Sequence, residues 1–268
     1  MNKLGTSTLK KFKNYLTLKN YSERTIECYS WAVLKFLESQ QKSTLHLSSA
    51  DFNNFIISYN FTSYQQQNQF ISALKILYTK ILNKKFIHVD FSRPRNEKKL
   101  PQIIDSEELL TSISKISNLK HKTIISLAYS VGLRVSEVIN LKIKDIDSKR
   151  MIIHIKNAKG KKDRIVPLSQ NVLELMRKYW LEFKPNIYLF NGQNSIQYSS
   201  SSCNAIVKKY INEKYHFHLL RHSCFTHLIE NGTDSRIIQK IAGHSSIKTT
   251  EGYMQVSTGV LNKIKLPL

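Results

Sequence analysis

Residues 216–255 read HFHLLRHSCFTHLIENGTDSRIIQKIAGHSSIKTTEGYMQ, and the rest of the chain is best interpreted outward from them. Their apolar spacing predicts a helix over about 218–230 and a second over about 234–241. The second helix is expected to end at Gly243, because glycine suits the left-handed residue that follows a helix. A last short helix is expected around 247–256.

Cations, imidazoles and a phenol gather in this segment. His218 and Arg221 are three residues apart, so they share one helix face near a helix N-terminus, which favours an anion. His244 directly follows Gly243, and Tyr253 comes nine residues later. Such a set is suited to hold a phosphodiester by its non-bridging oxygens while the tyrosine hydroxyl attacks the phosphorus.

The middle of the chain offers a second guanidinium for the same task. Arg134 lies at a predicted helix junction, two residues after Gly132. Together with a first arginine it would neutralise the charge that builds as phosphorus becomes five-coordinate. Glu137, three residues further on, is placed to orient Arg134.

Proton transfers need further groups. An unperturbed phenol has a pKa near 10, so Tyr253 needs a base, for which His218 is the candidate. Lys159, in a predicted hairpin tip, could donate a proton to the leaving 5′-oxygen. His244 would add a hydrogen bond to a non-bridging oxygen.

The chain is basic along its whole length. Its 268 residues carry a formal net charge of +22, with 14 basic and 5 acidic side chains in residues 1–95 and 27 and 14 in the remainder. This excess in both halves predicts two domains that bind one polyanion, in the first place a nucleic acid. No apolar run approaches the roughly 18 residues of a membrane span, and three scattered cysteines predict no disulfide framework, so a cytoplasmic protein is expected.

Residues 1–85 are predicted to form an N-terminal unit of four helices, because apolar side chains recur there at helical spacing. Its role as a DNA-binding domain is implied by the family resemblance described below. Residues 86–101 are predicted to be a linker, since two prolines bracket a charged run that a helix cannot continue through. Arg93 and Arg95 in this linker are candidate contacts to a DNA backbone. The four expected helices cover residues 8–18, about 22–38 with Ser22 as N-cap, 48–58 and 65–82.

Residues 102–268 are predicted to form a mainly helical catalytic domain with a small β-hairpin. Two β-branched stretches, MIIHIK from Met151 and RIVPL from Arg164, have the period of two that is typical of strands. Lys161 and Lys162 in the basic loop between them, and Arg164 after it, are candidate DNA contacts. Further helices are expected at about 105–116, 120–131, 170–183 and 201–213, with a short one capped by Ser136.

Five separated elements resemble the tyrosine recombinase (phage integrase) family, most of all its Xer-type members. The N-terminal unit, with YSERTIECY and the later RPR and KKLP segments, is similar to the core-binding domain of that family. The resemblance covers nearly the whole chain. The five elements are Gly132-Leu133-Arg134 with Glu137, AKGKKDRIVPL with Lys159, HLLRHSCFTHLIENG with His218 and Arg221, IAGHSSIKTT with Gly243 and His244, and Tyr253 at the family's spacing.

The resemblance implies a fold and a reaction. The fold is a two-domain, C-shaped clamp around DNA with an N-terminal SAM-like domain. The reaction is site-specific recombination at a short core site with inverted repeats, which serves integration, excision, inversion or dimer resolution. Tyr253 would form a 3′-phosphotyrosyl intermediate, and a tetramer of this chain, or of this chain with a paralogue, would exchange strands through a Holliday junction. Neither metal nor ATP is implied, because the covalent link conserves the energy of the phosphodiester.

The sequence departs from the family pattern in places. Ala158 precedes Lys159 where the family often has glycine, and Gln255 stands where a basic or imidazole residue is common. Only a short tail follows Tyr253, which bears on the family's docking of a C-terminal segment onto a neighbouring subunit. Because the helical unit starts almost at residue 1, no additional arm-binding domain is expected.

Other interpretations use the same residues. A type IB topoisomerase would need the same side chains and relaxes DNA without exchanging partners. A catalytically silent DNA-binding protein or a basic RNA-binding module would explain the charge but not the ordered motifs. At single positions, Tyr253 could be a packed aromatic and Arg134 a structural partner of Glu137. His222 and His227 are expected to be surface or buried imidazoles, and without a CxxC motif no metal site is predicted.

Overall fold

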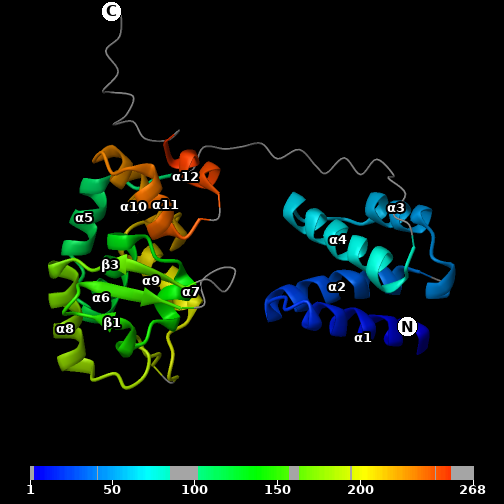
Figure 1. The fold of residues 1–268 in the computed structure, drawn as a ribbon, viewed down its shortest axis with the longest axis horizontal. Helices are drawn as coiled ribbons and strands as arrows, with labels where there is room; N and C mark the ends of the chain where they lie inside the picture. Colours follow the sequence, from blue (N-terminus) through cyan, green and yellow to red (C-terminus); the bar gives the residue numbers. More distant parts are fainter. Residues whose placement is uncertain are drawn as a thin grey trace, which may run out of the picture. The chain divides into compact units, whose positions relative to one another are not determined.

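The computed structural model describes residues 3–40, 42–84, 102–156, 163–193, 195–244 and 246–254. The chain divides into two compact units, Met1–Lys98 and Lys99–Leu268, and each is described by itself (Figure 1). Helices dominate both units and the second also holds a small sheet, so the predicted mainly helical fold is confirmed. The predicted linker, with Arg93 and Arg95, lies outside the described residues.

The helices of the first unit begin at polar caps. The Ser22 side chain accepts a hydrogen bond from the backbone N–H of Thr25, as the sequence predicts for this N-cap. Ser48 and Asp51 form a reciprocal capping box. The elements are α1 (Lys3–Leu18), α2 (Glu23–Ser39), the 3-10 turn η1 (Thr44–His46), α3 (Ser49–Ser58), α4 (Tyr64–Ile76) and the π-helical turn η2 (Leu77–Ile81).

Aromatic rings fill the core of the first unit. Phe36 lies edge-on to Phe55 with ring centroids 5.3 Å apart, and Phe55 stacks on Phe70 at 6.0 Å. The last predicted helix of this unit is not uniform, because α4 passes into the π-helical turn η2. There the Tyr78 hydroxyl donates to the carbonyl of Ser48 and ties the end of this helix to the start of α3.

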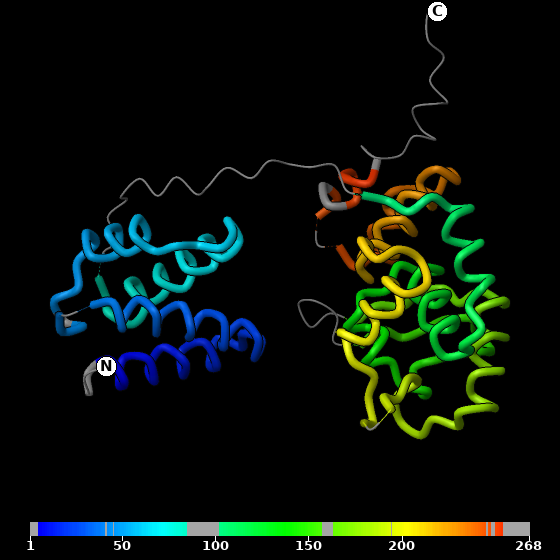
Figure 2. The backbone as a smooth tube through the Cα atoms, turned by 180° about the vertical axis from the view of Figure 1, so that it is seen from behind, coloured from blue at the N-terminus to red at the C-terminus, as the bar shows by residue number. Residues whose placement is uncertain are grey.

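The second unit packs its helices around a common apolar core (Figures 1 and 2). Helix α6 (Leu119–Val131) contacts both α8 (Gln170–Phe183) and α10 (His218–Glu230), and its Ile124 and Leu127 are fully buried. The elements are α5 (Ser106–Ser114), α6 (Leu119–Val131), α7 (Val135–Asn140), the 3-10 turn η3 (Ile143–Asp145), β1 (Ile146–Asp147), β2 (Ile152–Ile155), β3 (Arg164–Pro167), α8 (Gln170–Phe183), α9 (Ser200–Tyr210), α10 (His218–Glu230), α11 (Ser235–Ala242) and α12 (Ile247–Met254).

The sheet of the second unit is antiparallel, with strand order β1-β2-β3. The predicted hairpin is confirmed, with Ile153 opposite Val166 and Ile155 opposite Arg164. The sequence does not predict β1, which is only two residues long and pairs Ile146 with Ile153. Ile153, Ile155 and Val166 are buried, so this face of the hairpin joins the core.

Two helix ends in the second unit follow the local sequence, and one helix start does not. Gly132 and Gly243 are left-handed, with φ of +63° and +62°, at the ends of α6 and α11, as predicted. The exception is α7, for which the sequence predicts Ser136 as the cap. Instead Arg134 is the N-cap residue, and Oε2 of Glu137 accepts its backbone N–H at 2.8 Å. The carboxylate can do this because the third residue of a helix reaches back to its N-cap.

No helix within the described ranges is long and apolar enough to cross a membrane. In the same parts of the chain, no three His, Cys, Asp or Glu side chains gather closely enough to hold a metal ion. The three cysteines are unpaired, and Cys203 and Cys224 are buried as small apolar side chains.

A close contact at Gly132 yields a stability prediction. A Cβ here would lie 2.5 Å from Cζ of the fully buried Phe225, and the left-handed backbone also disfavours a side chain. We expect Gly132→Ala to lower the free energy of unfolding by about 3 kcal/mol, because overpacking adds to backbone strain. Urea unfolding followed by the fluorescence of Trp180, in a Trp31→Phe background, measures this change in the second unit.

Gly232→Ala is the matched control. Its φ is +81°, yet no atom lies within 4 Å of an added Cβ. Only the backbone strain remains, so the expected loss is about 1 kcal/mol. Equal losses at Gly132 and Gly232 would show that the contact with Phe225 does not constrain position 132.

Candidate active site

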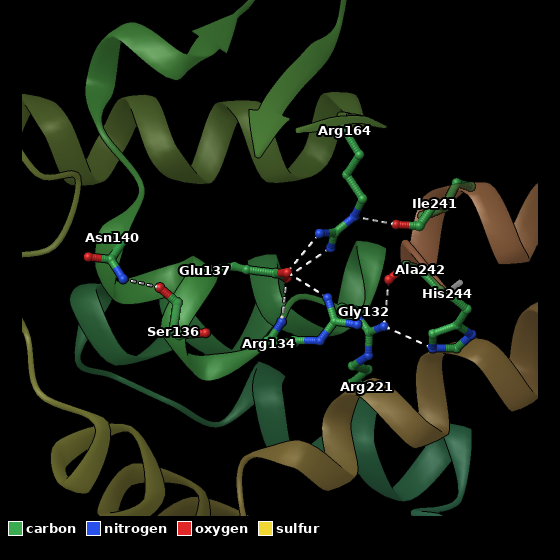
Figure 3. Close-up of polar contacts among 10 residues, drawn as sticks. All are labelled: Gly132, Arg134, Ser136, Glu137, Asn140, Arg164, Arg221, Ile241, Ala242 and His244. Carbon is green, nitrogen blue, oxygen red and sulfur yellow. Dashed lines mark hydrogen bonds and ion pairs between the residues drawn. The ribbon is translucent and has the colours of Figure 1, made fainter. Parts of the chain in front are cut away.

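Arg134 extends from the junction of α6 and α7. Its Nη1 donates to Oε1 of Glu137 at 2.8 Å, while its backbone N–H donates to the other oxygen of the same carboxylate (Figure 3). The Arg134 side chain is 18% exposed, whereas that of Glu137 is only 4% exposed. A buried carboxylate therefore directs a guanidinium that still faces solvent, which is the contact that the sequence predicts for this pair.

Arg164 contacts the same carboxylate from the other side (Figure 3). Its Nη1 and Nη2 donate to the two oxygens of Glu137 at 2.7 and 2.8 Å, and its Nε donates to the carbonyl of Ile241 at 2.7 Å. The side chain is 7% exposed. The sequence groups Arg164 with the candidate DNA contacts; in the structure its guanidinium points inward, and its donors are engaged by α7 and α11.

The Glu137 carboxylate is ionised despite its burial. Burial alone would raise its pKa, but the hydrogen bonds and charge of Arg164, together with the hydrogen bonds from Arg134, outweigh this effect and lower the pKa to about 2. Two guanidinium groups share one carboxylate here. The pocket therefore keeps a net positive charge, which favours an anionic ligand.

Arg221 is buried in α10, with 1% of its surface exposed. Its Nη1 donates to the carbonyl of Gly132 at 2.6 Å, and its Nη2 donates to that of Ala242 at 2.7 Å. Its guanidinium lies over the ring of Phe225, 4.7 Å from the centroid. Burial and then the charge of Arg134 lower the pKa of Arg221 to about 10, which still leaves it protonated at neutral pH.

His244 lies between Arg221 and Thr250. Its Nε2 is 3.1 Å from Nη2 of Arg221, and its Nδ1 is 3.0 Å from Oγ1 of the buried Thr250. A guanidinium can only donate, so Nε2 is the acceptor and Nδ1 carries the proton. Burial and the charges of Arg221 and Arg134 lower the pKa of His244 to about 4, which agrees with a neutral ring.

His218 and His222 lie one turn apart on α10. His218 is exposed at the rim of the cluster, and its ring meets that of His222 edge-on at 4.6 Å between centroids. Partial shielding by the protein and the charges of His222 and Arg221 lower the pKa of His218 to about 4. The ring is therefore neutral at pH 7 and able to accept a proton.

Tyr253 lies in α12 with 4% of its surface exposed. Its ring is nearly parallel to that of His244, with centroids 6.0 Å apart, and packs against Phe225 at 5.5 Å. Burial raises the pKa of Tyr253, while the charges of Arg221 and Arg134 oppose that rise. The phenol therefore belongs to the same cluster as the two arginines.

The structure brings six of the predicted site residues together. Arg164 joins them from β3 through an inward contact that strand periodicity does not reveal. The sequence assigns no role in the site to His222 or Thr250. The ring of His222 lies 5.4 Å from that of Tyr253, and the contacts of both residues depend on neighbours that only the fold supplies. The six are Arg134, Glu137, His218, Arg221, His244 and Tyr253, while Lys159, Lys161, Lys162, Arg93 and Arg95 lie outside the described residues.

The contacts of His244 predict its tautomer. At pH 7, before DNA binds, Nδ1 should carry the proton and Nε2 should not, which nitrogen chemical shifts of 15N-labelled protein report directly. Thr250→Val removes the acceptor at Nδ1 with little change of shape, so it should shift the Nδ1 signal while Nε2 stays unprotonated, because Arg221 still donates to Nε2. Thr226→Val, at another buried threonine, is the matched control and should leave the His244 signals unchanged. A protonated Nε2 in the wild type would contradict the arrangement.

The histidines also predict loss of stability in mild acid. His218 and His244 bind protons near pH 6.5 in the unfolded chain but only near pH 4 in the folded protein. The unfolded state therefore binds more protons in this window, so the free energy of unfolding falls as the pH is lowered from about 6.5 to about 4. Thermal melting at a series of pH values should show this fall.

Variants assign the effect to the cluster. His244→Gln cannot take up a proton, so its melting temperature should depend less on pH in this window. His154→Gln, on β2 outside the cluster, should keep the wild-type dependence. The same slope in wild type and His244→Gln would remove His244 from this explanation.

Comparison with known proteins agrees with the geometry. Residues 96–259 match the phage integrase family, and residues 8–88 match the phage integrase N-terminal SAM-like domain. The chain is 32% identical over 269 residues to tyrosine recombinase XerA of Pyrococcus horikoshii, covering 95% of this chain and 91% of that protein. It is 31% identical over 217 residues to XerD of Staphylococcus epidermidis, covering 73% of each.

A solved structure extends the similarity to the fold. The crystal structure of XerH site-specific recombinase bound to palindromic difH substrate, a post-cleavage complex, matches with a TM-score of 0.73 at 26% identity. The match covers 91% of this chain and 80% of that one. The resemblance inferred from the motifs is thus confirmed, and the chain belongs to the phage integrase family of tyrosine recombinases.

Proposed function

We propose that this Xer-like recombinase cleaves and rejoins DNA at a specific site, with Tyr253 as the nucleophile and Arg134 and Arg221 as the groups that bind the phosphate. The observation that supports this assignment most is the cluster itself. It places two guanidinium groups, the His244 imidazole and the Tyr253 phenol together, with a buried carboxylate directing one arginine. These are the groups that an in-line displacement at phosphorus requires.

In this proposal the two arginines bind the non-bridging oxygens. Arg134 is the more accessible, and Arg221 is fixed by two backbone carbonyls, so neither has to be ordered at the moment of reaction. Donors that are held in advance stabilise the charge of the five-coordinate transition state more than mobile ones. The ionised Glu137 keeps Arg134 in place without cancelling the positive charge of the pocket.

The cleavage step moves one proton to a base and one from an acid. The Tyr253 oxygen bonds to phosphorus and its proton passes to His218, while the bond from phosphorus to the 5′-oxygen breaks. That oxygen takes a proton from Lys159. The product is a 3′-phosphotyrosyl link, and a 5′-hydroxyl from the partner strand reverses the step to rejoin DNA. An anionic phosphate beside His218 would raise its pKa and so strengthen the base.

Phosphate entry requires a local movement, because Arg221 and Tyr253 are only 1% and 4% exposed. The incoming oxygens would replace His244 as the partner of Arg221. The imidazole would then change its tautomer or take a proton, and its Nε2 could donate to a non-bridging oxygen. In this proposal, the hydrogen bond between Arg221 and His244 occupies the position that a phosphate oxygen would take when DNA binds.

We infer that the substrate is duplex DNA with a short inverted-repeat core, bound by a tetramer of this chain or of this chain with a paralogue. The positive charge of the chain and the palindromic substrate of the related XerH complex support this inference. Residues 1–85 and residues 102–268 would each contact the duplex, and residues 86–101 would connect them. An enzyme acting on cellular DNA would work in the cytoplasm.

The proposal is tested by covalent trapping. Nicked duplexes made from the DNA that flanks the gene let a cleaved fragment diffuse away, so the covalent intermediate accumulates. The wild type should give a protein–DNA band on a denaturing gel in the presence of chelator, and Tyr253→Phe should abolish it. Arg221→Ala should slow band formation by about 100- to 1000-fold, since it removes a charge-assisted donor. Tyr188→Phe, outside the cluster in the same unit, is the matched control and should react like the wild type.

Three outcomes would redirect the assignment. A band that persists in Tyr253→Phe would exclude Tyr253 as the nucleophile. Equal bands on unrelated DNA would favour a type IB topoisomerase, which the match of residues 8–88 to the integrase SAM-like domain disfavours. Tight binding without any band would indicate an enzyme that needs a partner protein.

A further inference from the structure

We propose that Arg164 is a positioning residue for DNA cleavage, which sets the direction of Arg134 through Glu137 and anchors the end of α11 that leads to His244. The inference rests on the proposed function of Arg134 and His244. It assigns Arg164 a place inside the catalytic machinery in place of a contact with DNA.

The first part of the argument is the carboxylate that two arginines share. Arg164 binds both oxygens of Glu137 as a fork, at 2.7 and 2.8 Å. Arg134 binds the same two oxygens, one from its guanidinium and one from its backbone N–H, both at 2.8 Å. Figure 3 shows the carboxylate between the two arginines. Because the fork of Arg164 fixes the plane of the carboxylate, it also fixes the direction from which Arg134 is held.

The second part is the C-terminus of α11. The last carbonyls of a helix have no partner within the helix and need one elsewhere. Here two consecutive carbonyls are bound by two different arginines, Ile241 by Arg164 and Ala242 by Arg221, each at 2.7 Å. Gly243 and His244 follow directly in the chain. Both arginines therefore fix the backbone position from which the His244 side chain extends.

Close packing restricts this corner further. A Cβ at Gly243 would lie 3.0 Å from Cδ of Arg164, so the stem of the arginine runs directly beside the glycine backbone. The Arg164 side chain is 7% exposed, and its three bonds reach two elements, α7 and α11. A guanidinium can span these partners because its donors diverge in one plane, whereas a lysine ammonium is a single point charge.

The geometry therefore connects β3, α7 and α11 through one side chain. Arg164 is the first residue of β3, where it pairs with Ile155, and Glu137 and Ile241 lie 27 and 77 residues away in sequence. Its loss would let Arg134 and His244 move independently. A displacement of about 1 Å in a group that binds the transition state can slow a reaction about 100-fold.

The test measures single-turnover cleavage of a duplex by Arg164→Lys, which keeps the charge but loses the fork. At saturating DNA the rate should fall about 100-fold, while the affinity for DNA stays within about twofold of the wild type. Arg177→Lys, an exposed arginine on α8, is the matched control and should keep the wild-type rate.

A second substrate separates positioning from a general structural role. A methylphosphonate at the cleavage site replaces one non-bridging oxygen by a methyl group and removes its charge, so cleavage needs Arg134 less. The losses caused by Arg134→Ala and by Arg164→Lys should therefore both shrink on this substrate. In the double variant, the loss on normal DNA should be smaller than the product of the single losses, because Arg164 acts through Arg134.

The outcomes are distinct. Wild-type cleavage by Arg164→Lys, or a loss that is undiminished on methylphosphonate and multiplies with that of Arg134→Ala, would overturn the inference. If circular dichroism shows that Arg164→Lys does not fold, Glu137→Gln tests the same contact, since it keeps the shape but cannot accept hydrogen bonds from both arginines at both of its terminal atoms, and it must show the same substrate pattern. Failure of the proposed function is seen separately, because the wild type would then form no covalent product that depends on Tyr253.

Discussion

One buried carboxylate, that of Glu137, fixes the arrangement of two arginines in the candidate active site. Taking the charge of Glu137 out of water is unfavourable by itself, and it is stable here because Arg134 and Arg164 donate to both of its oxygens. Removing the carboxylate would leave two guanidinium groups without their shared anion in a region that is nearly closed to solvent. Because both arginines must donate hydrogen bonds to the same carboxylate, their positions relative to each other are restricted. One of them keeps an exposed edge toward the phosphate that we propose it binds.

Helix ends supply the rest of the framework. α6 and α11 both stop at left-handed glycines, and the carbonyls of Gly132 and Ala242 at these ends accept hydrogen bonds from Arg221. The C-terminal ends of α6 and α11 carry partial negative charge, and they bind the buried guanidinium of Arg221, which belongs to α10. Backbone groups change position less readily than side chains, so the guanidinium is held in advance and loses little entropy when an anion replaces His244 beside it.

Aromatic and imidazole rings surround Tyr253 in the candidate site. Tyr253 lies among Phe225, His222 and His244, and this packing raises its pKa by burial while the nearby arginines oppose that rise. The same shielding keeps His218 and His244 neutral at pH 7. The Tyr253 phenol and the His218 and His244 rings are therefore uncharged, and the positive charge of the cluster is carried by the arginines. A phosphate entering this site meets fixed cations and rings whose protonation it can change.

Local sequence determined most of the helices, their caps and the identity of the site. Helical spacing located the elements, Gly132 and Gly243 marked the ends of two of them, and the separate motifs around Arg134, Arg221, His244 and Tyr253 indicated phosphoryl-transfer chemistry. These features were readable because each depends on residues within a few positions of one another. Only the tertiary structure decided that Arg164 turns inward, that Arg221 and Thr250 contact the two ring nitrogens of His244, and that His222 lies against Tyr253. The physical reason is that each of these contacts joins residues of different elements; Arg164 and Ile241, for example, are 77 residues apart. Packing brings such residues together, and the local sequence pattern around either one does not identify its partner.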